Sequence, residues 1–87
     1  MFKIKNNTGE TIIQFNERGE WEFSIDREGY IELLVQADID LGKVDGGKPI
    51  KKYATQDRAM EVIKEITQKI LNAQRGKGAK FYIMPSD

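Results

Sequence analysis

The stretch NERGEWEFSIDREGY, Asn16 to Tyr30, decides the fold because it contains one short pattern twice. The tetrapeptides that begin at Asn16 and Asp26 each end in glycine and lie ten residues apart, and the segment from Asn6 to Gly9 adds a third copy. An Asn or Asp side chain can accept a hydrogen bond from the backbone ahead, and glycine adopts the left-handed conformation that closes a bulged hairpin. The three copies therefore predict three tight turns between four antiparallel strands.

The residues between the turns alternate in polarity. Within the segments 11–15, 20–25 and 30–36 the odd positions are almost all apolar and the even positions are largely polar. A sheet with one face on a core and one face in water requires this period of two. If the turns are bulged hairpins, Phe15 lies opposite Trp21 and Phe23 lies opposite Leu33. We expect the core face to consist of Ile13, Phe15, Trp21, Phe23, Ile25, Ile31, Leu33 and Val35.

The first strand does not fit this alternation. Its apolar residues, Phe2 and Ile4, occupy even positions, so the same turn geometry would point Lys3 and Lys5 inward. Either the turn at Asn6 has another register, or the strand lies at an edge and buries its apolar side elsewhere.

Residues 38–53 indicate a second hairpin. A tight turn at Asp45-Gly46-Gly47 would join strands Leu41–Val44 and Ile50–Tyr53. Pro49 has no amide hydrogen, so its strand must lie at an edge or begin there.

The hydrophobic period changes after Thr55. Apolar residues recur every three or four positions as far as Ala73, which is typical of an amphipathic helix. Thr55 is a natural N-cap and Gly76 a natural C-cap, so we expect a helix over residues 55–75 and a final strand over residues 80–84. The predicted fold is one α+β domain over residues 1–87. An antiparallel β-meander of four to six strands, largely within residues 1–53, carries the long helix on one face and ends in the short C-terminal strand.

The composition excludes several classes of protein. The 87 residues include no Cys and no His, which removes disulfides, thiolate metal sites and the usual proton shuttle. No apolar run approaches the ~20 residues that cross a bilayer, and residues 1–5 lack the apolar block of a secretion signal. We therefore expect a cytoplasmic protein with no membrane partner, no catalytic residues, no metal and no cofactor.

The charges are unevenly distributed. Residues 1–40 carry four Lys or Arg against nine Asp or Glu, whereas residues 41–87 carry ten against five. Overall neutrality argues against general nucleic-acid binding, but the basic half could hold one small anion. Two basic segments contain aromatic residues, and a sheet could bring them together to neutralise phosphates and stack a base. The candidate ligand-binding residues are Lys48, Lys51, Lys52, Tyr53, Arg75, Lys77, Lys80 and Tyr82.

Both basic segments also have a purely structural interpretation. Glycine and cations are expected after a helix C-terminus, and lysines protect an exposed strand edge from another sheet. The acidic sheet face, with Glu20, Glu22, Glu28 and Glu32, or an exposed strand edge could instead bind a partner protein. Ile12, Tyr30 and Leu34 have outward parity and could pair two copies of the chain.

The segment YATQDRAMEVIKEI, Tyr53 to Ile66, followed by FYIMP, Phe81 to Pro85, resembles a family of small, mostly uncharacterised proteins from phages and prophages of Gram-positive bacteria. Members of that family open with short strands, continue with a Y-x-T-x-x-R-A-x-E-V helix and finish near Y-x-M-P. Here Gln56 and Asp57 replace the usual Glu pair. The resemblance implies a mobile-element setting and no particular chemistry.

These observations favour a non-enzymatic phage or prophage accessory binding protein. It would occupy a host protein or sequester a small anionic, nucleotide-like signal. The alternative is a small homo-oligomeric structural or assembly protein.

Overall fold

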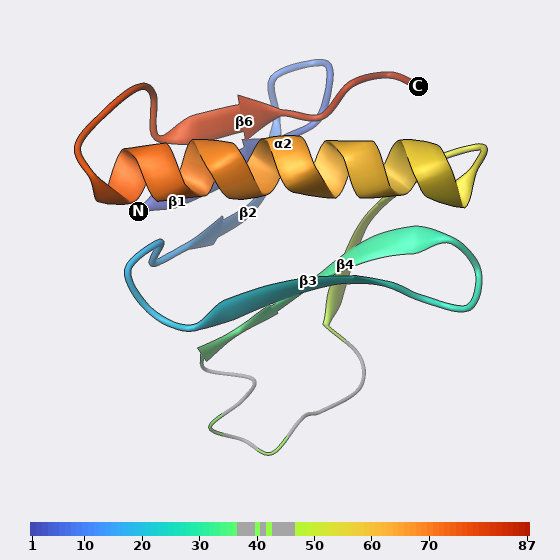
Figure 1. The fold of residues 1–87 in the computed structure, drawn as a ribbon, viewed down its shortest axis with the longest axis horizontal. Coiled ribbons are helices and arrows are strands. Elements are labelled where there is room, and N and C mark those ends of the chain that lie inside the picture. Colours follow the sequence, from blue (N-terminus) through green and yellow to red (C-terminus); the bar gives the residue numbers. More distant parts are fainter. Residues whose placement is uncertain (37–39, 41, 43–46) are drawn as a thin grey trace.

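The computed structural model describes residues 1–36, 40, 42 and 47–87 (Figure 1). Its fold is α+β, with six strands and one long helix among these residues. The elements are β1 (Phe2–Lys5), β2 (Thr11–Phe15), β3 (Trp21–Ile25), β4 (Tyr30–Val35), β5 (Lys48–Lys52), α2 (Gln56–Gln74) and β6 (Phe81–Ile83).

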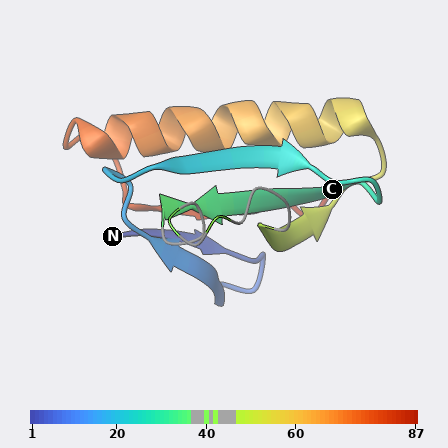
Figure 2. The ribbon, with the colours of Figure 1, turned by 90° about the horizontal axis from the view of Figure 1, so that it is seen from below.

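The strands form two small sheets. One has the order β2-β1-β6 and the other has the order β3-β4-β5. All neighbouring pairs are antiparallel except β1 and β6, which are parallel. The helix α2 contacts β3, β4 and β6, so it packs against both sheets and covers the core between them (Figures 1 and 2).

All three predicted turns are present. The amides of Gly9, Gly19 and Gly29 donate to the carbonyls of Asn6, Asn16 and Asp26 at 3.0, 3.0 and 3.1 Å. In each turn the Asn or Asp Oδ1 also accepts the amide two residues ahead, at 3.0 Å from Thr8, 3.0 Å from Arg18 and 2.9 Å from Glu28. The side-chain role predicted for these residues is confirmed.

The middle turn does not join two paired strands. Gly9 and Gly29 have φ values of 90° and 93°, whereas Gly19 is outside the left-handed region. Without that conformation the bulged hairpin does not close, and β2 and β3 belong to different sheets. The predicted pairing of Phe15 with Trp21 is therefore wrong, although their rings still meet edge to face with centroids 6.5 Å apart.

The second predicted register is confirmed. In the β3–β4 hairpin Phe23 pairs with Leu33 and Ile25 pairs with Ile31. The buried residues of this sheet include Ile31 and Leu33, while Glu22 and Ser24 are exposed. The predicted inward face is thus the buried face.

A register shift explains the anomalous first strand. Lys5 pairs with Thr11, as the turn geometry requires, but Ile4 pairs with Ile13, so a bulge accommodates Ile12. The extra residue changes the parity and points Phe2 and Ile4 into the core, where both are fully buried. Neither predicted alternative holds as stated, because the turn keeps the expected register, the shift comes from the bulge beyond it, and β1 is the central strand of its sheet.

Strand β5 lies at the edge of its sheet, as Pro49 requires. It pairs with β4 over Lys48–Lys52, two residues earlier than the predicted Ile50–Tyr53. Gly47 precedes it where a Cβ would lie 2.6 Å from the Leu33 carbonyl oxygen, so only glycine fits this close approach. The predicted strand Leu41–Val44 and the Asp45-Gly46 part of its turn lie outside the described residues.

The helix has the predicted start and end. The Thr55 Oγ1 accepts the Arg58 amide at 3.1 Å, and Arg75 is the C-cap, followed by Gly76 with a φ of 72°. The apolar stripe predicted from the period is the buried face of α2, and consists of Ala59, Val62, Ile66, Ile70 and Ala73.

The core combines this stripe with residues from both sheets. Its remaining fully or nearly fully buried members are Phe2, Ile4, Phe15, Ile31, Leu33, Tyr53, Tyr82 and Met84. Trp21 packs against this cluster, as its parity predicted. None of the described helices is long and apolar enough to span a bilayer.

Candidate functional site

The first basic segment lies on β5 and just after it. The Lys48 ammonium donates to the Ile12 carbonyl at 2.8 Å, which ties β5 to the edge of β2. Lys51 lies 5.5 Å from the centre of the Tyr53 ring and Lys52 lies 6.0 Å from the centre of the Tyr30 ring. Each of these cations therefore has a contact within the protein.

Tyr53 does not present a ring to a ligand. It is buried against the helix start, and its hydroxyl donates to the Pro85 carbonyl at 2.8 Å. Burial raises the pKa of Tyr53 to about 12, so this phenol is neutral over the physiological range.

The second basic segment follows α2. Arg75 caps the helix, Lys77 lies in the exposed loop after it, and Lys80 comes just before β6. The Lys80 ammonium is 3.3 Å from the carboxylate of Glu17, so Lys80 is already paired. Tyr82 is buried in the core, and burial together with the nearby negative charge of Glu65 raises the pKa of its hydroxyl above the ordinary value.

The structure does not bring the two basic segments together. Lys52 and Tyr53 adjoin the start of α2, whereas Arg75 and Lys77 follow its end, and the helix between them has 19 residues. At ~1.5 Å per residue its ends are about 28 Å apart. A single phosphate-and-base site formed by both segments is therefore absent from this arrangement.

The three outward apolar residues come from two different sheets. Ile12 is at the bulge of β2 and packs against the core, while Tyr30 and Leu34 are on β4 in the other sheet. All three are half-buried.

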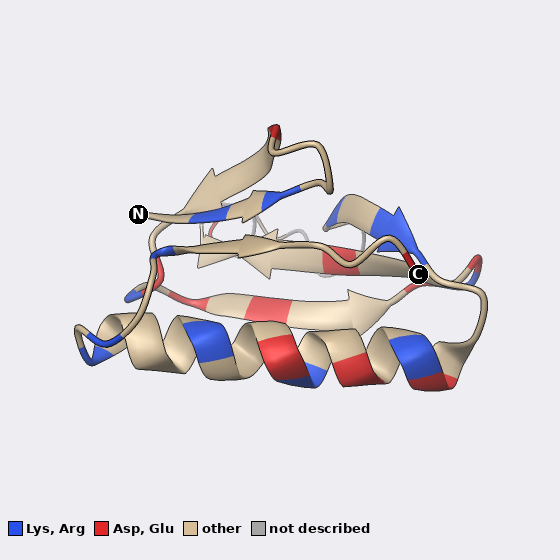
Figure 3. Ribbon diagram, turned by 90° about the horizontal axis from the view of Figure 1, so that it is seen from above, with Lys and Arg blue, Asp and Glu red and all other residues tan. Residues whose placement is uncertain are grey.

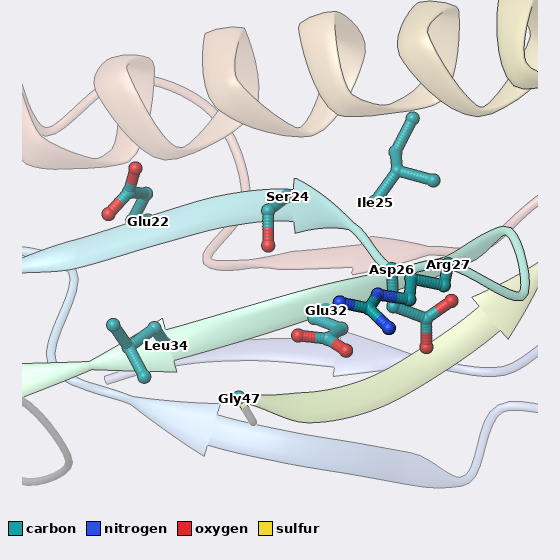
Figure 4. A pocket seen from close by; sticks show the side chains of 8 residues that line it. All are labelled: Glu22, Ser24, Ile25, Asp26, Arg27, Glu32, Leu34 and Gly47. Atoms are coloured by element: carbon teal, nitrogen blue, oxygen red, sulfur yellow. The ribbon is translucent and has the colours of Figure 1, made fainter. Parts of the chain in front are cut away.

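A broad groove lies on the outer face of the β3–β4 sheet (Figure 4). Its volume is about 600 Å³, and its polar lining comes from Glu22, Ser24, Asp26, Arg27 and Glu32. The Arg27 side chain extends over this face toward Glu32 in the close-up view. Within the described part of the chain no group of three His, Cys, Asp or Glu side chains is arranged to hold a metal ion.

Strand β6 carries the least protected surface. Phe81 and Ile83 are 43% and 48% exposed, and they are two of the four large apolar residues exposed among the described positions. Both point away from the core, because Tyr82 between them points inward. The Lys5 ammonium lies 5.0 Å from the centre of the Phe81 ring on the same face.

The edges of β2 and β5 are protected. Lys48 covers a carbonyl of β2, and Pro49 removes a donor from β5. Lysine and proline are common means of preventing one sheet from pairing with another. Strand β6 has neither within Phe81–Ile83 and has no neighbour on its second side among the described strands.

A groove runs between this open edge and the second half of α2. Its volume is about 310 Å³, and it is lined by Lys69, Asn72, Lys77, Gly78, Ala79, Phe81, Tyr82 and Ile83. Most of its surface is apolar, and its charged lining residues are two lysines. Lysine residues also lie on β1, on the other side of β6 (Figure 3).

The sequence analysis placed Lys77 and Tyr82 in a candidate site but missed Phe81 and Ile83. The run FYIM is apolar on both faces of a strand, so its alternation does not reveal which face is exposed. That depends on the partner of the strand, which is β1 from the far end of the sequence.

A scan against protein-family models, a search of curated proteins and a search of solved structures each found no match to this chain.

Proposed function

We propose that this protein is a non-enzymatic binding module, encoded by a phage or prophage, that captures a host protein in the cytoplasm. The observation that carries this proposal is the open edge of β6, where Phe81 and Ile83 are about half exposed, while the edges of β2 and β5 carry a protecting lysine and proline. Large apolar side chains on an unpaired strand edge are typical of surfaces that bind other polypeptides.

The positions of the tyrosines favour a protein over a nucleotide-like ligand. A base would stack on an exposed aromatic face, but Tyr53 and Tyr82 are both buried. The cations that would neutralise phosphates are divided between the two ends of α2. The two basic segments therefore do not form the shared site for a base and its phosphates that the sequence suggested.

The composition supports binding rather than catalysis. The chain has neither His nor Cys, and its two serines, Ser24 and Ser86, are exposed. An activated nucleophile needs an adjacent base and an orienting group, and no histidine is present to serve as that base.

Affinity capture from lysate of a Gram-positive host tests the proposal. The wild-type chain, an Ile83→Ser variant and a Met60→Ser variant are used as baits, and bound proteins are quantified by mass spectrometry. Met60 is a matched control because it is an apolar residue of α2 with a similar exposure, 43% against 48% for Ile83. We expect the wild type and Met60→Ser to enrich the same protein, and Ile83→Ser to lose most of it.

Native mass spectrometry of the gently purified chain can give results that contradict the proposal. A retained small molecule with nucleotide-like absorbance, and no enriched protein, would replace the proposal with the sequestration of a signal. A stable oligomer that captures nothing would favour the assembly alternative.

A further inference from the structure

We propose that β6 accepts an extended segment of the partner protein as an added strand, and that this segment alternates apolar and acidic residues. This inference rests on the proposed function, and it specifies the docking surface and the chemistry of what docks there. The occupant is an acidic strand from another protein rather than a second copy of this chain.

The backbone of β6 is oriented for such pairing. The Lys80 carbonyl accepts the Lys3 amide at 3.0 Å, and the Met84 amide donates to the Lys5 carbonyl at 2.8 Å. Backbone groups of successive residues in a strand point to opposite sides. Because the even-numbered residues of β6 face β1, the amides and carbonyls of Phe81 and Ile83 face the open edge.

One face of the added strand would meet apolar side chains. Phe81 and Ile83 project from the outer face of the sheet, two residues apart, and about half of each side chain is accessible. Side chains on the same face of the neighbouring strand would lie beside them and exclude water from both. Every second residue of the partner segment is therefore expected to be apolar.

The other face of the added strand would turn toward α2. Lys69 and Lys77 line the groove there, with Asn72 between them. No carboxylate is among the described residues that line it. Asp or Glu at the intervening positions of the partner would pair with these lysines, which gives the alternating pattern its acidic half.

The same charges argue against a second copy of the chain as the occupant. A second copy brings no carboxylate to this edge, because the charged residues that line its own groove are also Lys69 and Lys77, so self-pairing would leave the lysines of both copies unpaired. Like charges at an interface suppress the wrong partner. The lysines at this edge therefore favour an acidic segment and disfavour self-pairing.

A pair of synthetic peptides tests the inference directly. One peptide alternates valine and glutamate, and the other alternates valine and lysine, with the same length and blocked ends. Binding to the full chain is measured by fluorescence anisotropy and mapped by amide NMR shifts. We expect the acidic peptide to bind at least tenfold more tightly, with the largest shifts in Phe81, Ile83, Lys69 and Lys77.

Charge-reversal variants of the chain provide the matched control. The double variant Lys69→Glu/Lys77→Glu should bind the acidic peptide about tenfold or more weakly, because two attractive ion pairs become repulsions. The variant Lys64→Glu makes the same type of charge change on α2, outside the groove, and should leave the affinity within about twofold.

A third variant isolates the backbone contribution. Ile83→Pro removes an amide that faces the open edge and leaves the bonds to β1 intact, so binding should fall while the fold is retained by circular dichroism. Equal affinity for the two peptides, or unchanged binding by Lys69→Glu/Lys77→Glu, would overturn the inference. Self-association that Ile83→Pro abolishes would also overturn it, in favour of a second copy.

The two proposals can fail separately. If the wild-type chain captures a host protein that Ile83→Ser still captures, or whose bound segment is basic, the acidic-strand inference fails and the binding function stands. If nothing is captured and a small molecule is retained, the binding function itself fails.

Discussion

Two buried tyrosines in the core differ in a single contact. The Tyr53 hydroxyl donates to the Pro85 carbonyl at 2.8 Å, whereas the Tyr82 hydroxyl is buried near the Glu65 carboxylate and makes no hydrogen bond of normal geometry. Burial raises the pKa of both hydroxyls, so both are neutral near pH 7. A satisfied buried hydroxyl stabilises the fold, while an unsatisfied one costs desolvation free energy.

Phenylalanine substitutions should therefore have opposite effects. We expect Tyr53→Phe to lower the free energy of unfolding by about 1 kcal/mol, and Tyr82→Phe to leave it unchanged or raise it slightly. Urea denaturation at pH 7 followed by circular dichroism measures both, with each variant as the control for the other. A larger loss for Tyr82→Phe would mean that its hydroxyl has a partner.

Glu17 is a charged residue whose side chain is buried. Its side chain is 3% exposed, and its carboxylate lies 3.3 Å from the Lys80 ammonium and 3.4 Å from the Met1 amino group. The hydrogen bond from its own backbone amide, together with these cations, holds its pKa below the ordinary value in spite of the desolvation. The Glu17 carboxylate thus links the middle turn to the residues that precede β1 and β6.

This pKa shift predicts an acid-dependent loss of stability. Because the folded-state pKa is lowered, the stabilisation is present above the ordinary value of 4.5 and is lost as the pH falls through the folded-state pKa. We expect Glu17→Gln to cost about 1 kcal/mol at pH 7, since both partners are about half exposed and screened.

Denaturation curves collected over a pH series check this expectation. The difference in unfolding free energy between wild type and Glu17→Gln should shrink toward acid pH. Glu20→Gln, a change at an exposed position in the same turn, is the control and should show little difference at any pH. A constant gap across the series would show that the charge of Glu17 is unimportant.

Among the elements, α2 depends on its first turn. Thr55 has extended backbone angles, with φ of −132° and ψ of 154°, and its Oγ1 accepts the Arg58 amide. Otherwise that amide would be one of the unpaired donors at a helix start. The helix supplies five buried residues to the core, so its stability is coupled to that of the whole domain.

We expect Thr55→Ala to lower the free energy of unfolding by about 1 kcal/mol, because the cap acceptor is removed. Thr55→Ser keeps the hydroxyl and should retain nearly all of the stability. Thermal unfolding of the two variants beside the wild type measures the difference. Similar losses for both would point to the methyl group instead of the cap.

The sequence predicted individual turns, strands and the helix better than it predicted which strands pair with each other. The Asn6, Asn16 and Asp26 turns, the β3–β4 register and the buried stripe of α2 all depend on local chemistry, and the structure confirms them. The sequence did not predict the separation of β2 from β3, because it depends on the backbone angles of Gly19. Glycine can adopt many backbone conformations, so its presence does not specify which one occurs.

The candidate site was harder to predict for a similar reason. Lys51 and Lys52 were correctly placed on a strand and Lys48 was not, and the contacts of these lysines with Ile12, Tyr53 and Tyr30 are set by packing that no local pattern shows. The exposure of Phe81 and Ile83 follows from the parallel pairing of β6 with β1, which no local pattern encodes.

In the part of the chain that the structure describes, two sheets pack against the helix α2, and β6 forms an open edge of one of them. Hydrogen exchange reports directly on that edge, since amides without a partner exchange at nearly unprotected rates. We expect the amides of Phe81 and Ile83 to exchange quickly, and the amide of Met84, which donates to Lys5, to be protected.

Exchange measured by NMR resolves these residues individually. The amides of the central strand β4 serve as the internal reference for full protection. Slow exchange at Phe81 and Ile83 in the isolated chain would show that the edge is already covered. Addition of the acidic peptide should then slow these two amides alone among those of β6.

The parallel pairing of β1 with β6 also bears on how the protein is made. Among the strands, β1 is synthesised first and β6 last. The central strand of one sheet therefore lacks its β6 neighbour until late in synthesis. Contacts between distant segments form late and slow the search for the native state. The nascent chain should therefore remain open to proteases and chaperones until residue 84 has emerged, and native structure should appear only after translation of the domain is finished.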